Sequence, residues 1–290
     1  MKKAFLQLHM AIFLAGFTGI LGRLITINEG MLVWYRMLFT IIALWIIVLV
    51  TRKNQTVVKK EMAKMYLVGA IVALHWVFFY GSIKYANVSI GLVCFSAIGF
   101  FTALLEPLIL KRKIDTIELI LGIMVMVGIY FIFHFDPRYK TGILLGIVSS
   151  LLATCFTIFN KILLRQHTAM QVTVHELTGG WLSLTLMLPA YLYFFPIVHF
   201  LPSWADTGWL LVLSLFCTVL AFNLSMNALR KISPFTVNLS YNLEPLYGIL
   251  LAFLIYREDK ELEKGFYIGI SIILLTVLLQ SLRIWKTKSL

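Results

Sequence analysis

Two ionisable side chains lie near the centres of long apolar stretches, and their chemistry suits proton exchange. They are Glu244 and His75. An apolar environment disfavours the charged form of either group, so each can gain or lose a proton near neutral pH. We therefore predict Glu244 and His75 as candidates for proton coupling, and His75, with Trp76 and Tyr80 beside it, as a substrate-binding candidate. The alternatives are helix anchoring by Glu244 and an aromatic packing face around His75.

Neutral polar side chains recur at helical spacing in the second half of the chain. Residues three, four or seven positions apart share one face of a helix. The predicted substrate-binding residues of this kind are Asn223, Asn227, Asn238, Tyr241 and Asn242. A weaker stripe comprises Ser150, Thr154, Thr157 and Lys161. Such stripes favour a wet cavity, although the same groups can also form hydrogen bonds between helices, worth on average about 0.6 kcal/mol per contact in membranes.

One proline and several charges have predicted structural roles. Pro245 removes a backbone hydrogen bond in mid-helix, which predicts a hinge there. Arg23 and Arg36 are expected near the outer face, with their charges extending to the interface or, alternatively, forming a positively charged mouth. Lys161 and Glu176 are expected to pair. Glu106 is expected to anchor the bundle. Small residues in the apolar stretches are expected to let helices pack closely; they are Gly16, Gly19, Gly99, Gly122, Gly128, Gly146 and Gly269.

The composition identifies the elements that must position these residues. The 290 residues are 60% hydrophobic and 13% charged, with a mean hydropathy of +0.91, whereas soluble domains are about 45–50% apolar and about 25% charged. The surplus apolar surface predicts an all-α integral membrane protein. The net charge of +12 comes from short Lys and Arg runs between apolar stretches, so it indicates membrane topology and not a nucleic-acid partner. The three cysteines have no metal-binding or disulfide spacing.

Ten apolar stretches are long enough to span a bilayer, which requires about 20 residues. They cover residues 6–25, 32–50, 65–84, 88–110, 117–135, 142–164, 172–195, 207–229, 236–256 and 267–285. The first is too long for a cleaved signal peptide and is followed by many others. With the N-terminus inside, cytoplasmic segments carry sixteen Lys and Arg residues and external segments carry six. Both termini are therefore predicted to be cytoplasmic.

The two halves of the chain resemble each other when they are offset by 146 residues. This offset aligns Phe95 with Tyr241 and Lys111 with Arg257. A competing offset of 138 matches little beyond Glu106-Pro107 and Glu244-Pro245, and we interpret it as coincidence. Five spans separate the two copies, so the second copy must be inverted, as in many transporters. The predicted units are residues 1–140 and 141–290.

Two segments resemble the drug/metabolite transporter superfamily and, within it, the EamA-type family. They are residues 104–113 and 242–252, the latter followed by Arg257-Glu258. Pro245 and Glu258, thirteen positions later, fit the family pattern of a proline and a later acid. The first half departs from it, with Gly99 and Arg112 at the corresponding positions. The resemblance covers essentially the whole chain.

The resemblance implies ten transmembrane helices, arranged as two inverted five-helix repeats around a central cavity. Spans one, three, four, six, eight and nine are expected to line it. The implied function is secondary transport of small polar metabolites, such as amino acids, across a bacterial-type inner membrane, and no cofactor or metal is implied. A sugar-phosphate or nucleotide-sugar carrier is the alternative within the superfamily. A lipid-modifying membrane enzyme is the alternative from another class, but the sequence contains no HExxH or GxSxG motif for it.

Overall fold

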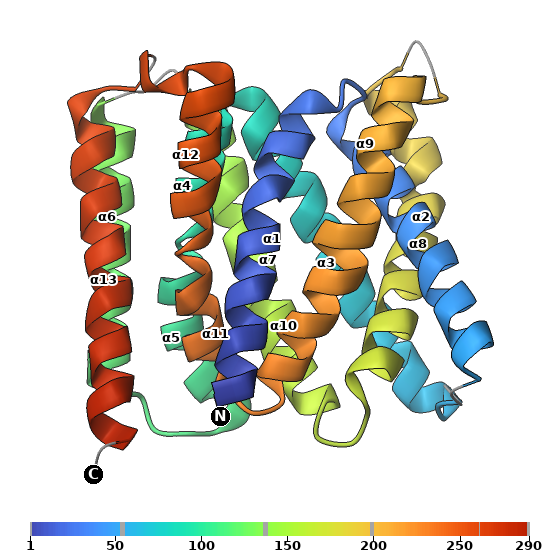
Figure 1. Cartoon of the computed structure of the whole chain (residues 1–290), viewed down its shortest axis with the longest axis horizontal. Helices are drawn as coiled ribbons and strands as arrows, with labels where there is room; N and C mark the ends of the chain where they lie inside the picture. Colours follow the sequence, from blue (N-terminus) through green and yellow to red (C-terminus); the bar gives the residue numbers. More distant parts are fainter. Residues whose placement is uncertain (1, 53–55, 136–138, 198–199, 261, 289–290) are drawn as a thin grey trace.

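Roughly antiparallel helices form a bundle, with α1 beginning and α13 ending on the same side (Figure 1). The computed structural model describes residues 2–52, 56–135, 139–197, 200–260 and 262–288. Within these ranges every regular element is helical. The first half contains α1 (Lys2–Leu24), α2 (Glu29–Thr51), α3 (Lys59–Tyr85), α4 (Val88–Phe95), α5 (Ile98–Leu110) and α6 (Thr116–Phe135). The second half contains α7 (Lys140–Leu163), α8 (Ala169–Phe194), α9 (Trp204–Ser214), the π-helical η2 (Leu215–Leu220), α10 (Ala221–Leu229), α11 (Pro234–Tyr241), α12 (Glu244–Tyr256), the short 3₁₀ helix η3 (Glu258–Lys260) and α13 (Lys264–Lys288).

Seven helical segments of the described chain are long and apolar enough to cross a membrane. They are α1, α2, α3, the α4–α5 unit, α7, the unit from α9 to α10 and the α11–α12 unit. The apolar parts of α6 and α13 are shorter, covering Thr116–Ile132 and Lys264–Gln280. Each of the ten predicted spans overlaps one helix or one interrupted helical unit. That all ten cross the bilayer remains a prediction.

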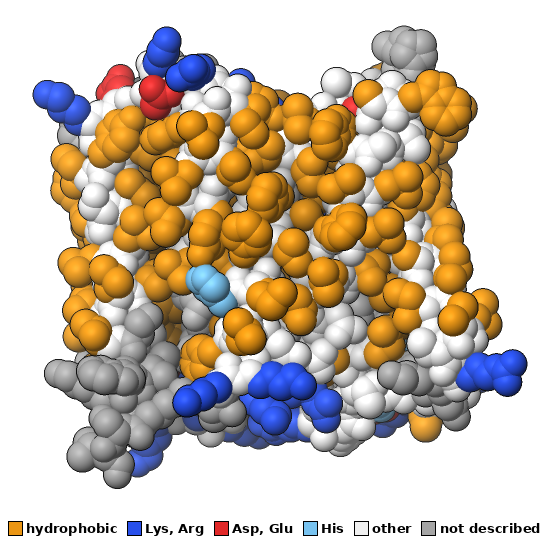
Figure 2. Space-filling model, in the orientation of Figure 1, with side chains coloured by type: hydrophobic (Ala, Val, Ile, Leu, Met, Phe, Trp, Pro, Cys, Tyr) orange, Lys and Arg blue, Asp and Glu red, His pale blue; other side chains and the backbone are white. Residues whose placement is uncertain are grey.

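The surface of the bundle is apolar around its middle. Figure 2 shows hydrophobic side chains across the central part of one face, with Lys and Arg gathered toward its two edges. Several apolar side chains of the described chain are largely exposed; Leu186 is 84% exposed and Val50 is 77% exposed. Water solvates so much contiguous apolar surface poorly. This distribution is the one expected for a surface that faces lipid.

Helix pairs at the two ends of the bundle frame its centre. α6 packs along α13 at one end, and α2 packs along α8 and α9 at the other (Figure 1). Small residues permit the first of these contacts, because a methyl group added to Gly128 would lie 2.8 Å from the Gly269 carbonyl oxygen. Between the ends, α3 packs along α7 and α8, while α1 packs along α10 and α12.

Two of the helical units are interrupted at equivalent places. The first interruption, at Ser96 and Ala97, separates α4 from α5, and the second, at Asn242 and Leu243, separates α11 from α12. Asn242 follows Ser96 by 146 residues, which is the spacing of the sequence repeat. Pro245 lies in the first turn of α12, where its missing N–H breaks no helical hydrogen bond. The predicted hinge position thus coincides with the start of a new helix.

A buried carboxylate holds the N-terminus of each interrupted unit. Glu258 accepts hydrogen bonds from the backbone N–H groups of Val88 (3.1 Å) and Ser89 (2.9 Å), and it forms an ion pair with Arg23. On the opposite side of the bundle, Glu106 accepts a hydrogen bond from the Phe235 N–H at 2.7 Å. A carboxylate at a helix N-terminus satisfies otherwise unpaired donors and favours the helix dipole. Both carboxylates join one half of the chain to the other.

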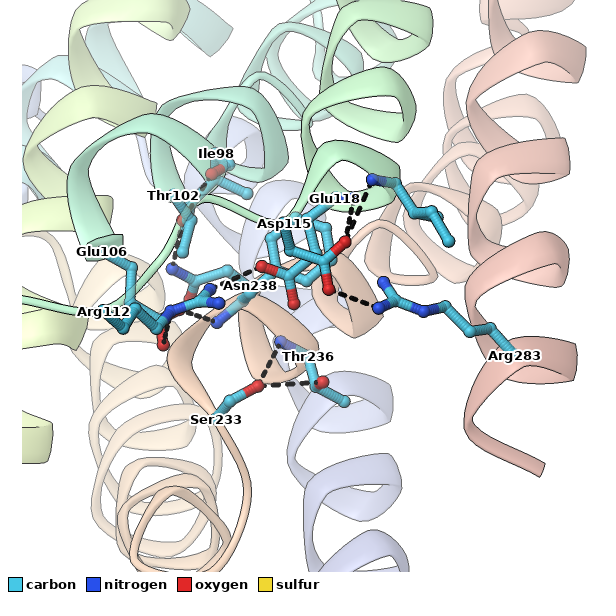
Figure 3. A network of polar contacts seen from close by, with 12 residues as sticks. Ile98, Thr102, Glu106, Arg112, Asp115, Glu118, Ser233, Thr236, Asn238 and Arg283 are labelled. Carbon is cyan, nitrogen blue, oxygen red and sulfur yellow. Dashed lines mark hydrogen bonds and ion pairs between the residues drawn. The ribbon is translucent and has the colours of Figure 1, made fainter. Parts of the chain in front are cut away.

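Glu106 belongs to a wider polar network near the end of α5 (Figure 3). Arg112 Nε lies 3.3 Å from Glu106 Oε1, and its guanidinium also binds Glu118. Asp115 accepts hydrogen bonds from the N–H of Glu118 and forms an ion pair with Arg283 of α13. These contacts connect α5, α6, α11 and α13, consistent with the anchoring role expected for Glu106.

Candidate functional site

A cavity with about 810 Å³ of empty space, counting open solvent at its mouth, lies at the centre of the bundle. It is bordered by the six spans that the family resemblance implies and also by α2, through Arg36. Its polar lining comprises Thr18, Arg36, His75, Thr157, Asn160, Ser225, Asn238, Tyr241 and Glu244. Its aromatic lining comprises Trp76, Phe79, Phe95, Phe156 and Phe222. A mostly apolar pocket with a few converging polar groups is typical of small-molecule sites.

Five of the predicted site residues border this cavity, namely His75, Trp76, Asn238, Tyr241 and Glu244. The other four, Tyr80, Asn223, Asn227 and Asn242, do not belong to its lining. Tyr80 lies behind it, with its hydroxyl bonded to the Arg36 guanidinium. Asn242 is buried at the α11–α12 interruption, and neither polar atom of its side chain has a hydrogen-bond partner in the described part of the chain.

The two asparagines of α10 bond to each other along their own helix. Asn227 Nδ2 donates to Asn223 Oδ1 at 2.7 Å and to the Asn223 carbonyl oxygen at 2.9 Å. The residues of α10 that border the cavity are Ala221, Phe222, Ser225, Met226 and Leu229. The predicted face of α10 therefore differs from the one next to the cavity. Of the hydroxyl stripe on α7, only Thr157 borders it.

The His75 ring is fixed by Ser149 of α7. Its Nδ1 lies 2.9 Å from the Ser149 carbonyl oxygen and 2.8 Å from Ser149 Oγ. A carbonyl oxygen only accepts hydrogen bonds, so Nδ1 carries the proton, which leaves Nε2 as the acceptor of the neutral ring. The rings of Phe95 and Phe156 lie with their centroids 5.4 Å from that of His75. His75 is thus both a cavity residue and part of an aromatic cluster.

Glu244 brings a carboxylate to the cavity from the first turn of α12. Glu244 is 4% exposed, and its side chain borders the cavity together with Tyr241 and Asn238. Asn238 is itself held by Thr102 of α5, since its Nδ2 donates to Thr102 Oγ1 at 2.8 Å. No described side chain forms a hydrogen bond or an ion pair with the Glu244 carboxylate. This acid therefore faces the cavity without the anchoring contacts that hold Glu106 and Glu258.

Arg36 is a cavity residue that the sequence prediction placed wrongly. It is 3% exposed, and its side chain points into the bundle, not toward the interface. The helix begins earlier than the hydropathy indicated, because Asn28 caps it by accepting the Met31 N–H at 2.8 Å. The Asn28-Glu29 pair is the sequence signal for that start. This start at Glu29 places Arg36 two turns inside α2.

Among the other charges, Arg23 is exposed at the end of α1, as expected, and it forms an ion pair with Glu258 and lies over the ring of Tyr256. Lys161 does not pair with Glu176. Its Nζ donates instead to two backbone carbonyls, including that of Ile232 at 2.8 Å, because helix ends expose unpaired carbonyls. Glu176 accepts a hydrogen bond from Asn160 Nδ2 at 2.9 Å.

Comparisons with known proteins identify the family and the fold of the chain. The chain is 22% identical over 237 residues to a Haemophilus influenzae protein described as an uncharacterized transporter, covering 78% of this chain and 74% of that protein. A crystal structure with 15% sequence identity superimposes with a TM-score of 0.71 and covers 97% of both chains, which shows a shared fold. The profile of the EamA-like transporter family matches residues 2–134 and 140–282. The chain therefore belongs to the EamA-like transporter family, whose members are multi-pass membrane proteins.

Proposed function

We propose that the chain is a secondary transporter that moves small polar metabolites, such as amino acids, across a bacterial-type inner membrane by alternating access. The observation that carries this proposal is the central cavity, where Arg36, His75 and Glu244 meet inside a bundle with an apolar surface. Ionisable groups at membrane depth are costly, and they commonly mark a solute or proton pathway.

The proposal includes ten spans arranged as two inverted repeats. Its support is the 146-residue spacing of the two helix interruptions and the division of the family match into two stretches. The carboxylate caps provided by Glu106 and Glu258 also connect the halves in both directions. Two related halves that exchange conformations would open the cavity alternately to each side.

The experiment that tests transport is solute flux into proteoliposomes containing the purified full-length chain. Metabolite profiling of cells with and without the protein selects the solutes to test. A transporter moves solute without altering it, whereas a membrane enzyme would change its chemistry. Chemical conversion without net flux of any selected solute would overturn the proposed function.

Both termini are expected to be cytoplasmic. The motivation is the sixteen-to-six Lys and Arg bias, together with the placement of the first and last helix ends on one side of the bundle (Figure 1). Reporter fusions after Lys288 and within residues 52–64 should both give a cytoplasmic signal. An external signal from either fusion would contradict the topology and the inverted repeat with it.

Two asparagines of the ninth span are expected to differ in their access to water. Both side chains are buried, but Asn238 borders the cavity, whereas Asn242 lies at the helix interruption and is not part of the lining. In a background without the native cysteines, Asn238→Cys should react with small water-soluble thiol reagents several times faster than Asn242→Cys. Substrate should slow the first reaction and leave the second unchanged. Equal rates at the two positions would place the water pathway elsewhere.

A further inference from the structure

Arg36 carries a buried positive charge that no carboxylate neutralises at ion-pair distance among the described residues. Its side-chain partners are all neutral: Nε donates to Thr218 Oγ1 at 2.9 Å, Nη1 to the Tyr80 hydroxyl at 2.7 Å, and Nη2 to the Cys217 carbonyl oxygen at 3.5 Å. Burying an ionised group is expensive unless an opposite charge compensates for it. The guanidinium therefore favours an anion that enters the cavity.

The orientation of this guanidinium is fixed before any ligand binds. Arg36 Cζ lies 3.8 Å from the centroid of the Trp76 ring, a cation–π distance. Its backbone carbonyl accepts hydrogen bonds from Thr40 Oγ1 at 2.7 Å and Ser214 Oγ at 3.0 Å. A guanidinium has five N–H donors. Three are used by the neutral partners, and the two that remain, one on each terminal nitrogen, suit the two oxygens of a carboxylate.

Glu244 supplies the opposite charge to the same cavity. It comes from α12, whereas Arg36 comes from α2, so the two charges belong to different halves of the chain. Both border the same cavity, and no ion pair joins them in the described structure. The space between them borders several aromatic rings, including Phe79 and Phe156. A ligand with both charges and an apolar group would match all three features.

We infer that the cavity binds a small zwitterion, with its carboxylate on Arg36 and its cationic group on ionised Glu244. The apolar remainder of the ligand packs against the aromatic lining. This inference rests on the proposed function, because it names the chemical class of the transported solute. It assigns Arg36 as a specificity-determining residue.

The first test removes one charge at a time from the ligand. The probes are L-leucine with 3-methylbutylamine and 4-methylpentanoate, and L-phenylalanine with 2-phenylethylamine and 3-phenylpropanoate. Binding to the purified full-length chain is measured by calorimetry. At least one zwitterion should bind about tenfold or more tightly than either of its analogues, since each analogue leaves one buried charge unpaired. If neither zwitterion exceeds its analogues, or neither binds, the inference is wrong.

The second test removes one charge at a time from the protein. Arg36→Gln should bind the zwitterion and the amine equally, and Glu244→Gln should bind the zwitterion and the acid equally. Arg230→Gln removes an exposed arginine that is not part of the cavity lining and should keep the wild-type preferences. Unchanged preferences in folded Arg36→Gln would overturn the assignment. If that variant does not fold, Arg36→Lys should weaken zwitterion binding while still favouring it over the amine, and the ligand series on the wild type decides independently.

Flux separates the failure of this inference from the failure of the proposed function. Transport that does not depend on Arg36 would contradict the zwitterion site but leave the transporter intact. Selective binding of the zwitterion without any flux would contradict the transport function but would still support the zwitterion site.

Discussion

Glu244→Gln should abolish uphill transport driven by a pH gradient, while exchange down a concentration gradient persists once the solute is concentrated enough to offset its weaker binding. The glutamine keeps the shape of the side chain and its hydrogen-bonding capacity, but it cannot take up and release a proton. Glu244 is suited to this role because it borders the cavity and no described residue anchors its carboxylate. In proteoliposomes, accumulation of the solute against its gradient should fall to the level of protein-free vesicles.

The matched control is Glu176→Gln, which changes another buried glutamate. Glu176 lies outside the cavity lining, where it accepts a hydrogen bond from Asn160 that a glutamine oxygen can also accept. This variant should keep uphill transport. If Glu244→Gln still concentrates solute at the wild-type rate, Glu244 has a structural role. His75 then becomes the next candidate for proton coupling, or the protein is a uniporter.

Hydropathy predicted the order of the helices well but not their ends. The expected span 65–84 lies inside α3, Lys59–Tyr85, and the expected span 6–25 begins four residues after α1 does. A hydropathy pattern reports which part of a helix lies in the apolar phase, whereas the helix itself continues through polar residues at the interface. The error at Arg36 has a different cause, because hydropathy does not tell which side of a helix faces the interior, and the Arg36 side chain is buried in the cavity lining.

The helix interruptions were only partly predictable. Pro245 indicates the second one, because proline cannot supply a mid-helix hydrogen bond. Ser96 and Ala97 carry no comparable signal, and the chain breaks there between two apolar helices. Only the 146-residue repeat connects that position to Asn242.

The cavity residues were predictable by type more often than by helical face. Glu244 and His75 were identifiable because ionisable groups are rare in apolar stretches. Asn223 and Asn227 do share a face, as their spacing predicts, but spacing does not tell which neighbour that face meets. The π-helical turn of η2 precedes them, marked by the backbone hydrogen bond from the Ala221 N–H to the Phe216 carbonyl oxygen, five residues earlier. A wider turn shifts the phase of the helix that follows, which a regular helical wheel does not include.

Contacts between α3 and α8 depend on glycines that the sequence pattern did not single out. A methyl group added to Gly69 would lie 1.8 Å from the Glu176 carbonyl oxygen and 2.7 Å from the Gly180 nitrogen. A methyl group on Gly180 would in turn lie 2.5 Å from the Gly69 carbonyl oxygen. All three atoms belong to the backbone, so no side-chain rotation can relieve the overlap. The two helices can approach this closely only because small residues face each other.

Gly69→Ala should therefore destabilise the protein strongly, by about 1–3 kcal/mol or more, because α3 and α8 must move apart. Gly208→Ala is the matched control. A methyl group at Gly208 meets nothing within 4 Å, and alanine favours a helix by up to about 1 kcal/mol over glycine. Heating both variants in detergent and measuring the remaining monodisperse protein compares them directly. The unfolding temperature of Gly69→Ala should lie well below that of the wild type, and that of Gly208→Ala should equal or exceed it. Equal unfolding temperatures for the two variants would contradict the close contact.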